Sequence, residues 1–223
     1  MSALAPPLNA ADLLQRLRAE GRVLLSGVSW EAYRALIDSV GERALLHTYD
    51  RGTLELVTRS REHEIYKCLL GRLIDVWADE TLTPLGYGGE MTLQRGDVER
   101  GVEGDECFWV GNLERLTDPL HIDLSRDPPP DLVIEAEVST TVVDRLSVYA
   151  TLGVPEVWRV SASRIRVGRL QPDGQYQWGE QSTVFPALPL AEVLRFLQQA
   201  ATTPDHRRIA RDFRAWVRQQ LGR

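Results

Sequence analysis

The segment from Pro128 to Val138 constrains the fold of this chain more than any other. Its three prolines exclude a helix, and the DLVIEAEV run of Asp131–Val138 is apolar enough for a central strand. A predicted helix, capped by Thr141 and ending near Thr151, and a predicted strand at 156–160 come next. Because a strand–helix–strand order is typical of a crossover between parallel strands, the sequence predicts an α/β fold with a mixed sheet.

Flanking segments add helices and hairpins on both sides of this crossover. Upstream, hydrophobic spacing and turn residues predict helices at 9–18, 30–40 and 60–78, and strands at 22–26, 44–49, 53–58, 86–94 and 105–110. Downstream, they predict a hairpin of strands at 164–170 and 175–180, followed by helices at 190–200 and 205–221. No internal repeat or long linker divides the 223 residues, so we expect a single domain over residues 1–223.

Carboxylates alternate with apolar side chains along the predicted strand at 131–138. Asp131, Glu135 and Glu137 fall on one face, because successive side chains of a strand point to opposite faces. Buried carboxylates are costly unless they are paired or bind a metal ion. The pattern therefore indicates either a functional cluster or a strand end that meets solvent or arginine partners. Such oxygen ligands suit Mg²⁺ or Mn²⁺, whereas the histidines are too scattered in sequence to indicate zinc.

Distance decides which of these acids could bind one ion. Asp131 and Glu135 are roughly 13 Å apart along an extended strand, which is too far for two bonds to one Mg²⁺. A neighbouring strand lies only about 4.8 Å away, so Asp105 of the predicted strand at 105–110 could meet Glu135 directly. Glu137, roughly 7 Å from Glu135 on the same face, could bind the same ion through water or help to hold a second one.

Charge is distributed unevenly along a chain whose formal net charge is −6. Residues 96–137 are rich in Asp and Glu, whereas residues 201–223 are rich in arginine. Arginines on the last predicted helix could follow a nucleic-acid backbone, and an amphipathic helix with a solvated basic face is the alternative. These candidate contacts are Arg207, Arg208, Arg211 and Arg214.

The N-terminal and apolar segments indicate where the protein resides. No apolar run approaches the roughly 18 residues that a membrane-spanning helix needs. The opening MSALAPP lacks the basic start of a secretory signal. We therefore expect a cytoplasmic protein without a membrane partner.

Four motifs follow one another along the chain: Gly101–Val110 (GVEGDECFWV), Pro129–Ser139 (PPDLVIEAEVS), Asp144–Tyr149 (DRLSVY) and Leu152–Arg159 (LGVPEVWR). Together with the REHE start of a preceding helix, they resemble the Uma family of restriction endonucleases, within the PD-(D/E)XK nuclease superfamily. The resemblance covers a core of about residues 30–160, with a C-terminal extension at 161–223. It implies a restriction-endonuclease-like α-β-β-β-α-β core with an N-terminal helix and hairpin and a C-terminal hairpin plus helices.

The resemblance also implies roles for individual residues. Asp105 would be the metal-binding aspartate and Glu135 the glutamate of the (D/E)XK element, in an enzyme that cleaves phosphodiester bonds with Mg²⁺. Glu137 stands where that element has a lysine, so another cation would have to support the attacking water and the transition state. Arg145, at a basic position of the family, and Lys67, the only lysine of the chain, are the two candidates.

The helix that contains Lys67 carries two further candidates. His63 and Glu64 match the family's helix, and Glu64 could add a metal ligand. A histidine at the edge of an apolar helix face is also typical of a hydrogen-bonded core residue, which is the alternative for His63.

Two hypotheses of different class follow. The first is a Mg²⁺- or Mn²⁺-dependent endonuclease that hydrolyses DNA, acting as a homodimer because cleavage of both strands of a duplex needs two sites. The second is a catalytically degenerate nuclease fold that serves as a DNA- or protein-binding module, which the missing lysine favours. Binding of Mn²⁺ distinguishes them, because a module without chemistry has no reason to keep clustered acids that bind metal.

Overall fold

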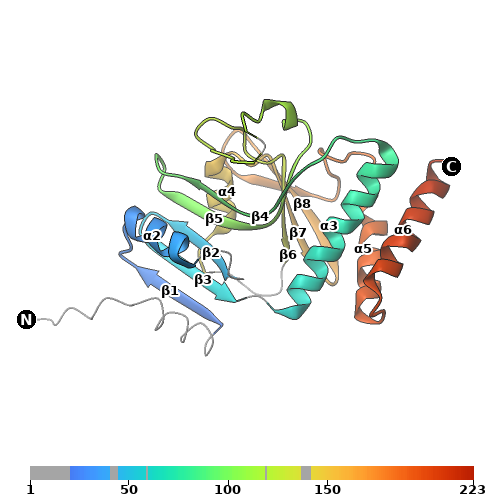
Figure 1. The fold of residues 1–223 in the computed structure, drawn as a ribbon, viewed down its shortest axis with the longest axis horizontal. Coiled ribbons are helices and arrows are strands. Elements are labelled where there is room, and N and C mark those ends of the chain that lie inside the picture. Colours follow the sequence, from blue (N-terminus) through green and yellow to red (C-terminus); the bar gives the residue numbers. More distant parts are fainter. Residues whose placement is uncertain (1–20, 41–44, 59, 119, 137–141) are drawn as a thin grey trace, which may run out of the picture.

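The structure is a computed structural model that describes residues 21–40, 45–58, 60–118, 120–136 and 142–223. Its described residues form a nine-stranded mixed sheet with the order β1-β3-β2-β5-β6-β7-β8-β9, and β4 pairs with β5 alongside this path (Figure 1). The strands are β1 (Arg22–Ser26), β2 (Leu45–Asp50), β3 (Thr53–Thr58), β4 (Gly86–Arg95), β5 (Arg100–Trp109), β6 (Leu132–Ala136), β7 (Glu156–Ser161), β8 (Arg164–Leu170) and β9 (Tyr176–Gly179). The helices are α2 (Trp30–Val40), α3 (Arg61–Thr81), α4 (Arg145–Leu152), α5 (Leu190–Gln198) and α6 (His206–Gln220), with short 3₁₀ turns at Leu113–Arg115 and Gln199–Ala201.

The predicted crossover is confirmed at the centre of this sheet. Strands β6 and β7 are parallel, with Leu132 opposite Glu156 and Ala136 opposite Val160, and α4 connects them. The other neighbouring strands pair in antiparallel fashion. The predicted α/β class with a mixed sheet is therefore correct.

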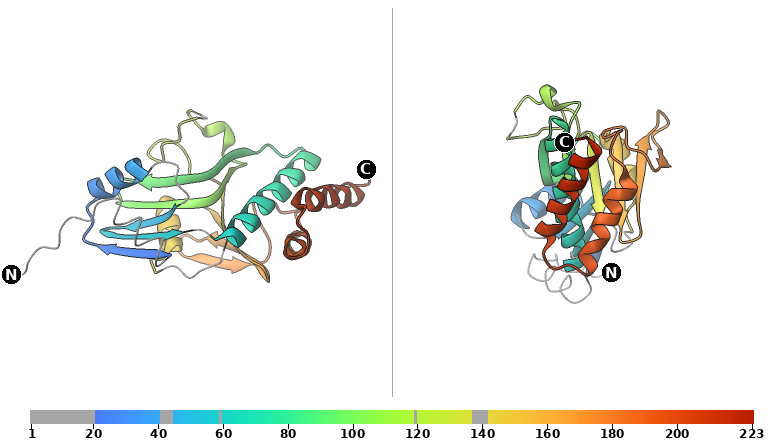
Figure 2. Two further views of the ribbon diagram at one scale, coloured as in Figure 1. Left: turned by 60° about the horizontal axis from the view of Figure 1, so that its bottom comes forward. Right: turned by 90° about the vertical axis from the view of Figure 1, so that its right-hand side faces the viewer.

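Two apolar clusters cover opposite faces of the central strands. Leu132 and Ile134 of β6 pack with α3, α5 and α6, whereas Val133 packs with α4. This split follows from the period of two along a strand. Figure 2 shows α5 and α6 side by side at the end of the molecule that carries the C-terminus, next to α3. A third cluster joins α2 to β1, β2 and β3 around Tyr33 and Leu54.

Some observed helix ends match those predicted from the sequence, and others differ. Ser60 caps α3 as predicted, because its hydroxyl accepts a hydrogen bond from the His63 amide at 3.1 Å. Gly153 ends α4 with a φ of 81°, which favours glycine. The helix α3 continues to Thr81, however, three residues beyond the predicted end.

The start of α4 was predicted wrongly. The helix begins at Arg145 rather than after Thr141, and Asp144 is its N-cap, accepting hydrogen bonds from the amides of Leu146 and Ser147. The reason is a long-range contact, because the buried Glu55 carboxylate of β3 accepts the amides of Val142 and Val143 at 2.8–2.9 Å. Those amides are therefore held outside the helix.

Two predicted strands also have different limits. β5 begins at Arg100, five residues before the predicted start at 105, because it forms a tight hairpin with β4 in which Arg95 is opposite Arg100. β6 begins at Leu132, so Asp131 precedes the strand. The predicted helix at 9–18, the Thr141 position, and the strand residues Glu137 and Val138 lie outside the described residues.

No described helix combines the length and the apolar character needed to cross a membrane.

Candidate active site

The candidate site lies where the pairing of β5 changes from one neighbour to another. Residues 100–102 of β5 pair with β2, whereas residues 106–108 pair with β6. Asp105 lies between these two ladders. Its carboxylate accepts a hydrogen bond from the Ala136 amide of β6 at 2.9 Å. In a continuous β5–β6 ladder, a backbone carbonyl of β5 would accept from that amide instead. The fork between β2 and β6 thus opens the sheet at the predicted site.

Asp105 is buried, with 1% of its surface exposed, and its two carboxylate oxygens differ in their hydrogen bonding. Oδ2 contacts the Ala136 amide and lies 2.8 Å from His63 Nε2. Oδ1 is buried and has no hydrogen-bond partner among the residues that the structure describes. A buried carboxylate oxygen without a donor is costly, so this atom is suited to a cation.

His63 is positioned by the first turn of α3 and by the Ser60 cap. Its Nε2 faces Asp105, and its Nδ1 lies 3.2 Å from Glu64 Oε1. Burial alone would lower the pKa of His63, but the hydrogen bonds and charges of Asp105 and Glu64 raise it above its usual value. Both candidates from this helix therefore lie at the site, with His63 as a hydrogen-bonded partner of Asp105.

Glu135, on β6, is held by two side chains of α4. Arg145 donates from Nε to Oε2 at 2.9 Å and from Nη2 to Oε1 at 2.6 Å, so the guanidinium binds the carboxylate with two parallel hydrogen bonds. The Tyr149 hydroxyl also donates to Oε1. Arg145 and Tyr149 reach the same carboxylate because residues four apart share one face of a helix.

Arg145, besides binding Glu135, also donates hydrogen bonds to two further strands. Its Nη1 donates to Thr48 Oγ1 of β2 at 2.9 Å, and its Nη2 donates to the Glu103 carbonyl of β5 at 2.6 Å. Burial alone would lower the pKa of Arg145, but the facing Glu135 carboxylate raises it above its usual value. Burial raises the pKa of Glu135, Arg145 opposes this effect, and the nearby Asp105 charge adds to it.

The structure therefore brings Asp105 and Glu135 together, as the strand spacing predicted, but gives them different surroundings. Asp105 contacts α3 through His63, whereas Glu135 contacts α4 through Arg145. Glu137, the third predicted acid, lies outside the described residues. Within the described ranges, no group of three or more His, Cys, Asp and Glu side chains is arranged to hold a metal ion.

Lys67 lies on the α3 side of the site, among acids. Its Nζ is 2.9 Å from Glu64 Oε2 and also contacts Glu90 Oε1 of β4. Burial raises the pKa of the neighbouring Glu106, and the Lys67 charge opposes that rise. Of the two candidate cations, Arg145 therefore contacts Glu135, whereas the ion pairs of Lys67 are with Glu64 and Glu90.

Asp131 directly precedes β6, and its carboxylate holds the backbone that follows β5. Its carboxylate accepts hydrogen bonds from the Val110 amide at 2.7 Å, the Asn112 amide at 3.0 Å and the Asn112 side chain at 2.7 Å. These contacts close the turn that leaves β5. Asp131 therefore lies just before β6, whereas Glu135 lies near the end of that strand.

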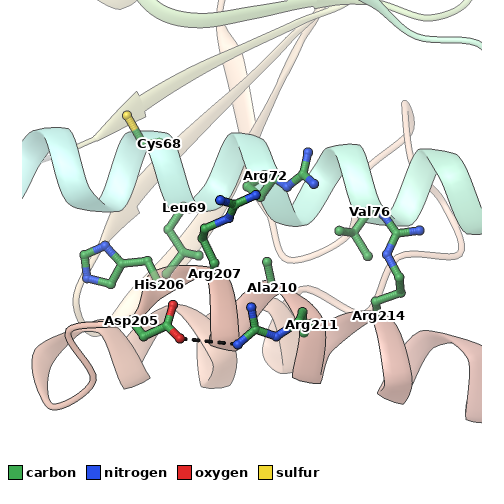
Figure 3. Close-up of a pocket in the computed structure, with 10 residues that line it drawn as sticks. All are labelled: Cys68, Leu69, Arg72, Val76, Asp205, His206, Arg207, Ala210, Arg211 and Arg214. Carbon is green, nitrogen blue, oxygen red and sulfur yellow. Dashed lines mark hydrogen bonds and ion pairs between the residues drawn. The ribbon is translucent and has the colours of Figure 1, made fainter.

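Three arginines of α6, Arg207, Arg211 and Arg214, border a groove of about 650 Å³ between α6 and α3 (Figure 3). Most of them form ion pairs with acids. Arg214 contacts Asp79 at 2.9 Å and Glu80 at 2.5 Å, and Arg211 contacts Asp205 at 3.3 Å. The remaining two predicted contacts are Arg208, paired with Asp212, and Arg207, which has no ion pair within the described part of the chain.

Two features of the site were not predicted from the sequence. Tyr149 was expected to be a core residue only, although its spacing of four residues from Arg145 on one helix was a usable signal. Thr48 could not have been found, because it lies 97 residues before Arg145 and meets it only through the β2–β5 pairing.

Comparisons with known proteins agree with this architecture. Residues 30–204 match the family described as "Uma2: Putative restriction endonuclease". The crystal structure of "a putative nuclease belonging to DUF820" from Anabaena variabilis has a similar fold, with a TM-score of 0.52 and 11% sequence identity, covering 76% of this chain and 99% of that one. No curated protein matches the chain. The structural similarity supports the nuclease-like fold that the motifs implied.

Proposed function

The chain belongs to the Uma2 family, and from this premise we propose that it is a Mg²⁺- or Mn²⁺-dependent endonuclease that hydrolyses phosphodiester bonds of DNA. The observation that carries the proposal is the buried Asp105 oxygen that has no donor among the described residues, beside the partly buried Glu135 carboxylate at the fork of the sheet. A buried carboxylate oxygen without a donor destabilises an apolar core, whereas a hard divalent cation prefers carboxylate oxygens as ligands.

The residues present fit a divalent cation in part. Asp105 Oδ1 has no competing donor in the part of the chain that the structure describes, and Glu135 is one strand away. Both Glu135 oxygens accept hydrogen bonds from Arg145, so Glu135 would have to share them. In this proposal Asp105 and Glu135 hold the cation and Glu137 assists. The bound ion would lower the pKa of an attacking water and offset phosphate charge.

Arg145 supplies the positive charge that the missing lysine of the (D/E)XK element would otherwise provide. Its pKa is raised above an already high value, so the guanidinium stays protonated and cannot act as a base. It can stabilise negative charge on a phosphate that approaches Glu135. His63 acts on Asp105, because its hydrogen bond holds Oδ2 and leaves Oδ1 as the oxygen for the cation.

A Mn²⁺ titration monitored by thermal unfolding tests the metal site without knowledge of a substrate. Ligand that binds only the folded protein raises its melting temperature by mass action. We expect the parent protein to gain stability and Asp105→Asn and Glu135→Gln to lose that gain. Asp173→Asn, in the exposed β8–β9 turn, is the matched control and should respond like the parent. Equal responses of all four proteins would refute the site.

Cleavage of supercoiled plasmid in the presence of Mn²⁺ then tests the reaction. We expect nicked and linear products from the parent protein and none from Asp105→Asn. Linear product would further support a homodimer, because cutting both strands takes two sites. The mass of the protein in solution, measured by light scattering, checks that state directly.

One observation favours the alternative, a degenerate fold that binds DNA or protein. The Glu135 carboxylate is saturated by Arg145 and Tyr149, so it is stable without a metal ion. A module of this kind would bind DNA in the plasmid assay without cutting it. It would also show no Mn²⁺-dependent change in melting temperature.

A further inference from the structure

Two neighbouring side chains of the β2–β3 hairpin bind the start of α4. Thr48 of β2 is directly opposite Glu55 of β3, so both side chains project from the same face of the sheet. Thr48 Oγ1 accepts a hydrogen bond from Arg145 Nη1 at 2.9 Å. The buried Glu55 carboxylate accepts hydrogen bonds from the amides of Val142 and Val143 at 2.8–2.9 Å. The hairpin thus contacts both the Arg145 side chain and the backbone just before it.

Both carboxylate oxygens of Glu55 take part in these contacts. Oε1 lies 2.9 Å from the Val142 amide nitrogen and 3.1 Å from Arg22 Nε of β1. Oε2 accepts hydrogen bonds from the Val142 amide and from the Val143 amide. Hydrogen bonds to an ionised carboxylate are roughly twice as strong as those between neutral groups. Because the Val143 side chain is also buried, the backbone that enters α4 is held firmly against β3.

The N-cap of α4 acts differently from Glu55. Asp144 accepts hydrogen bonds from the amides of Leu146 and Ser147, so it determines at which residue the helix begins. It does not determine where this first turn lies relative to the sheet, since the cap and the two amides belong to the same short segment. Glu55 belongs to the sheet itself. Its contacts therefore set the distance between β3 and the first turn of α4.

Arg145 is the first residue of α4, so its place depends on this first turn. Its guanidinium donates two parallel hydrogen bonds to Glu135, which require the planar group and the carboxylate to be aligned. The helix has eight residues, and helices shorter than about 12–15 residues are only marginally stable without tertiary contacts. Release of the first turn from β3 would therefore loosen the alignment of Arg145 with Glu135.

We infer that Glu55 is a positioning residue for Arg145, acting through the Val142 and Val143 amides. The inference rests on the proposed function for the task of Arg145, which is to stabilise negative charge on the phosphate. Glu55 acts from outside the site, because its contacts within the described residues are with Arg22 and the two valine amides. A shift of about 1 Å at a reacting group can lower a rate roughly 100-fold, so such a contact matters for turnover.

The kinetics of plasmid nicking in Mn²⁺ test this role with Glu55→Gln. Glutamine keeps the size of the side chain, but only one of its two terminal atoms can accept a hydrogen bond. The contacts to the two valine amides and to Arg22 can then no longer all be made. We expect kcat to fall about 10- to 100-fold with an unchanged KM, because Arg145 would be misaligned for the transition state.

Glu156→Gln is the matched control for a loss of stability. Glu156 is also a buried carboxylate that holds a distant backbone segment, since it accepts hydrogen bonds from the Thr183 amide and the Ser182 hydroxyl. It is opposite Leu132, at the other end of β6 from Glu135. All proteins are assayed below their melting temperatures. We expect the control to lose stability and to keep the kcat of the parent protein.

Hydrogen exchange of the Arg145 side chain gives a readout that does not require cleavage. NMR of ¹⁵N-labelled protein follows the Nε–H group, which donates to Glu135 Oε2, and its signal is assigned by its absence from Arg145→Lys. Local opening of a contact speeds the exchange of its protons. We therefore expect several-fold faster exchange in Glu55→Gln, and exchange like that of the parent protein in Glu156→Gln.

The outcomes separate the role of Glu55 from the proposed function. Faster exchange with a lower kcat in Glu55→Gln alone supports positioning. Unchanged exchange in Glu55→Gln overturns it, as does a kcat equal to that of the parent protein, or changes of the same size in Glu156→Gln. If the parent protein cleaves no plasmid, the nuclease is refuted, and faster exchange in Glu55→Gln alone still supports Glu55 as the residue that positions Arg145.

Discussion

Asp105 and Glu135 lie on adjacent strands, but their surroundings differ in one respect that matters for chemistry. Asp105 faces His63 and keeps one buried oxygen without a donor in the described structure. Glu135 faces α4, and both of its oxygens accept hydrogen bonds from Arg145. The two carboxylates are therefore not equally available to a cation. Any cation that uses both must compete with the Arg145 guanidinium for Glu135.

The largest effect is expected from Glu135→Gln. Arg145 is 8% exposed, and this change would leave its charge buried beside a neutral amide. Removing one partner of a buried ion pair costs about 3–5 kcal/mol of the free energy of unfolding. Urea denaturation measures this loss. The double variant Glu135→Gln, Arg145→Gln should recover part of it, and a loss in the single variant no larger than in the double one would contradict the interpretation.

The second largest effect is expected from Arg145→Lys, which weakens the hold on Glu135. Lysine is a point charge and cannot make the two parallel hydrogen bonds to Glu135, so we expect a loss of about 1.5–3 kcal/mol. One Glu135 oxygen would then be free, and the Mn²⁺-induced rise in melting temperature should be larger than in the parent protein. Arg100→Lys is the matched control, because Arg100 is equally buried but contacts Ser147 and Asp50 instead of Glu135. The same Mn²⁺ response in both variants would argue against competition by Arg145.

A smaller effect is expected from Asp105→Asn. An amide oxygen can still accept from the Ala136 amide and from His63, and Oδ1 has no donor among the described residues, so we expect a loss of about 1 kcal/mol. Asp131→Asn makes a matched comparison, since the Asp131 carboxylate accepts three hydrogen bonds and should lose more stability. Chemical denaturation of the two variants measures the difference. If Asp105→Asn is the more destabilised, Asp105 is chiefly structural.

The smallest effect is expected from Thr48→Val, which removes one hydroxyl acceptor from Arg145 and keeps the shape of the side chain. We expect a loss of about 0.5 kcal/mol, the lower end for a hydrogen bond, because Arg145 keeps its bonds to Glu135 and to the Glu103 carbonyl. Thermal and urea unfolding should show this modest loss with the Mn²⁺ response retained. A loss as large as that of Glu135→Gln would place the main support of Arg145 on β2 rather than on Glu135.

Local sequence signals predicted most of the elements. Ser60 with acids in the first turn, and Gly153 after an apolar stripe, marked helix ends because caps act over only a few residues. The apolar run at 131–138 marked the central strand, since burial on both faces demands such a run. The start of α4 was missed because the Glu55 carboxylate, 87 residues away, holds the Val142 amide outside the helix.

The residue pattern shows which chemical groups are available: acids on two neighbouring strands, a basic residue after the crossover strand and a histidine in the first turn of α3. How these groups pair depends on the fold. Arg145 meets Glu135, Thr48 and the Glu103 carbonyl because β2 and β6 share one edge of β5. The physical reason is that hydrogen bonds act over about 3 Å. Partners far apart in sequence are therefore set by strand order and register, which depend on the packing of the whole chain.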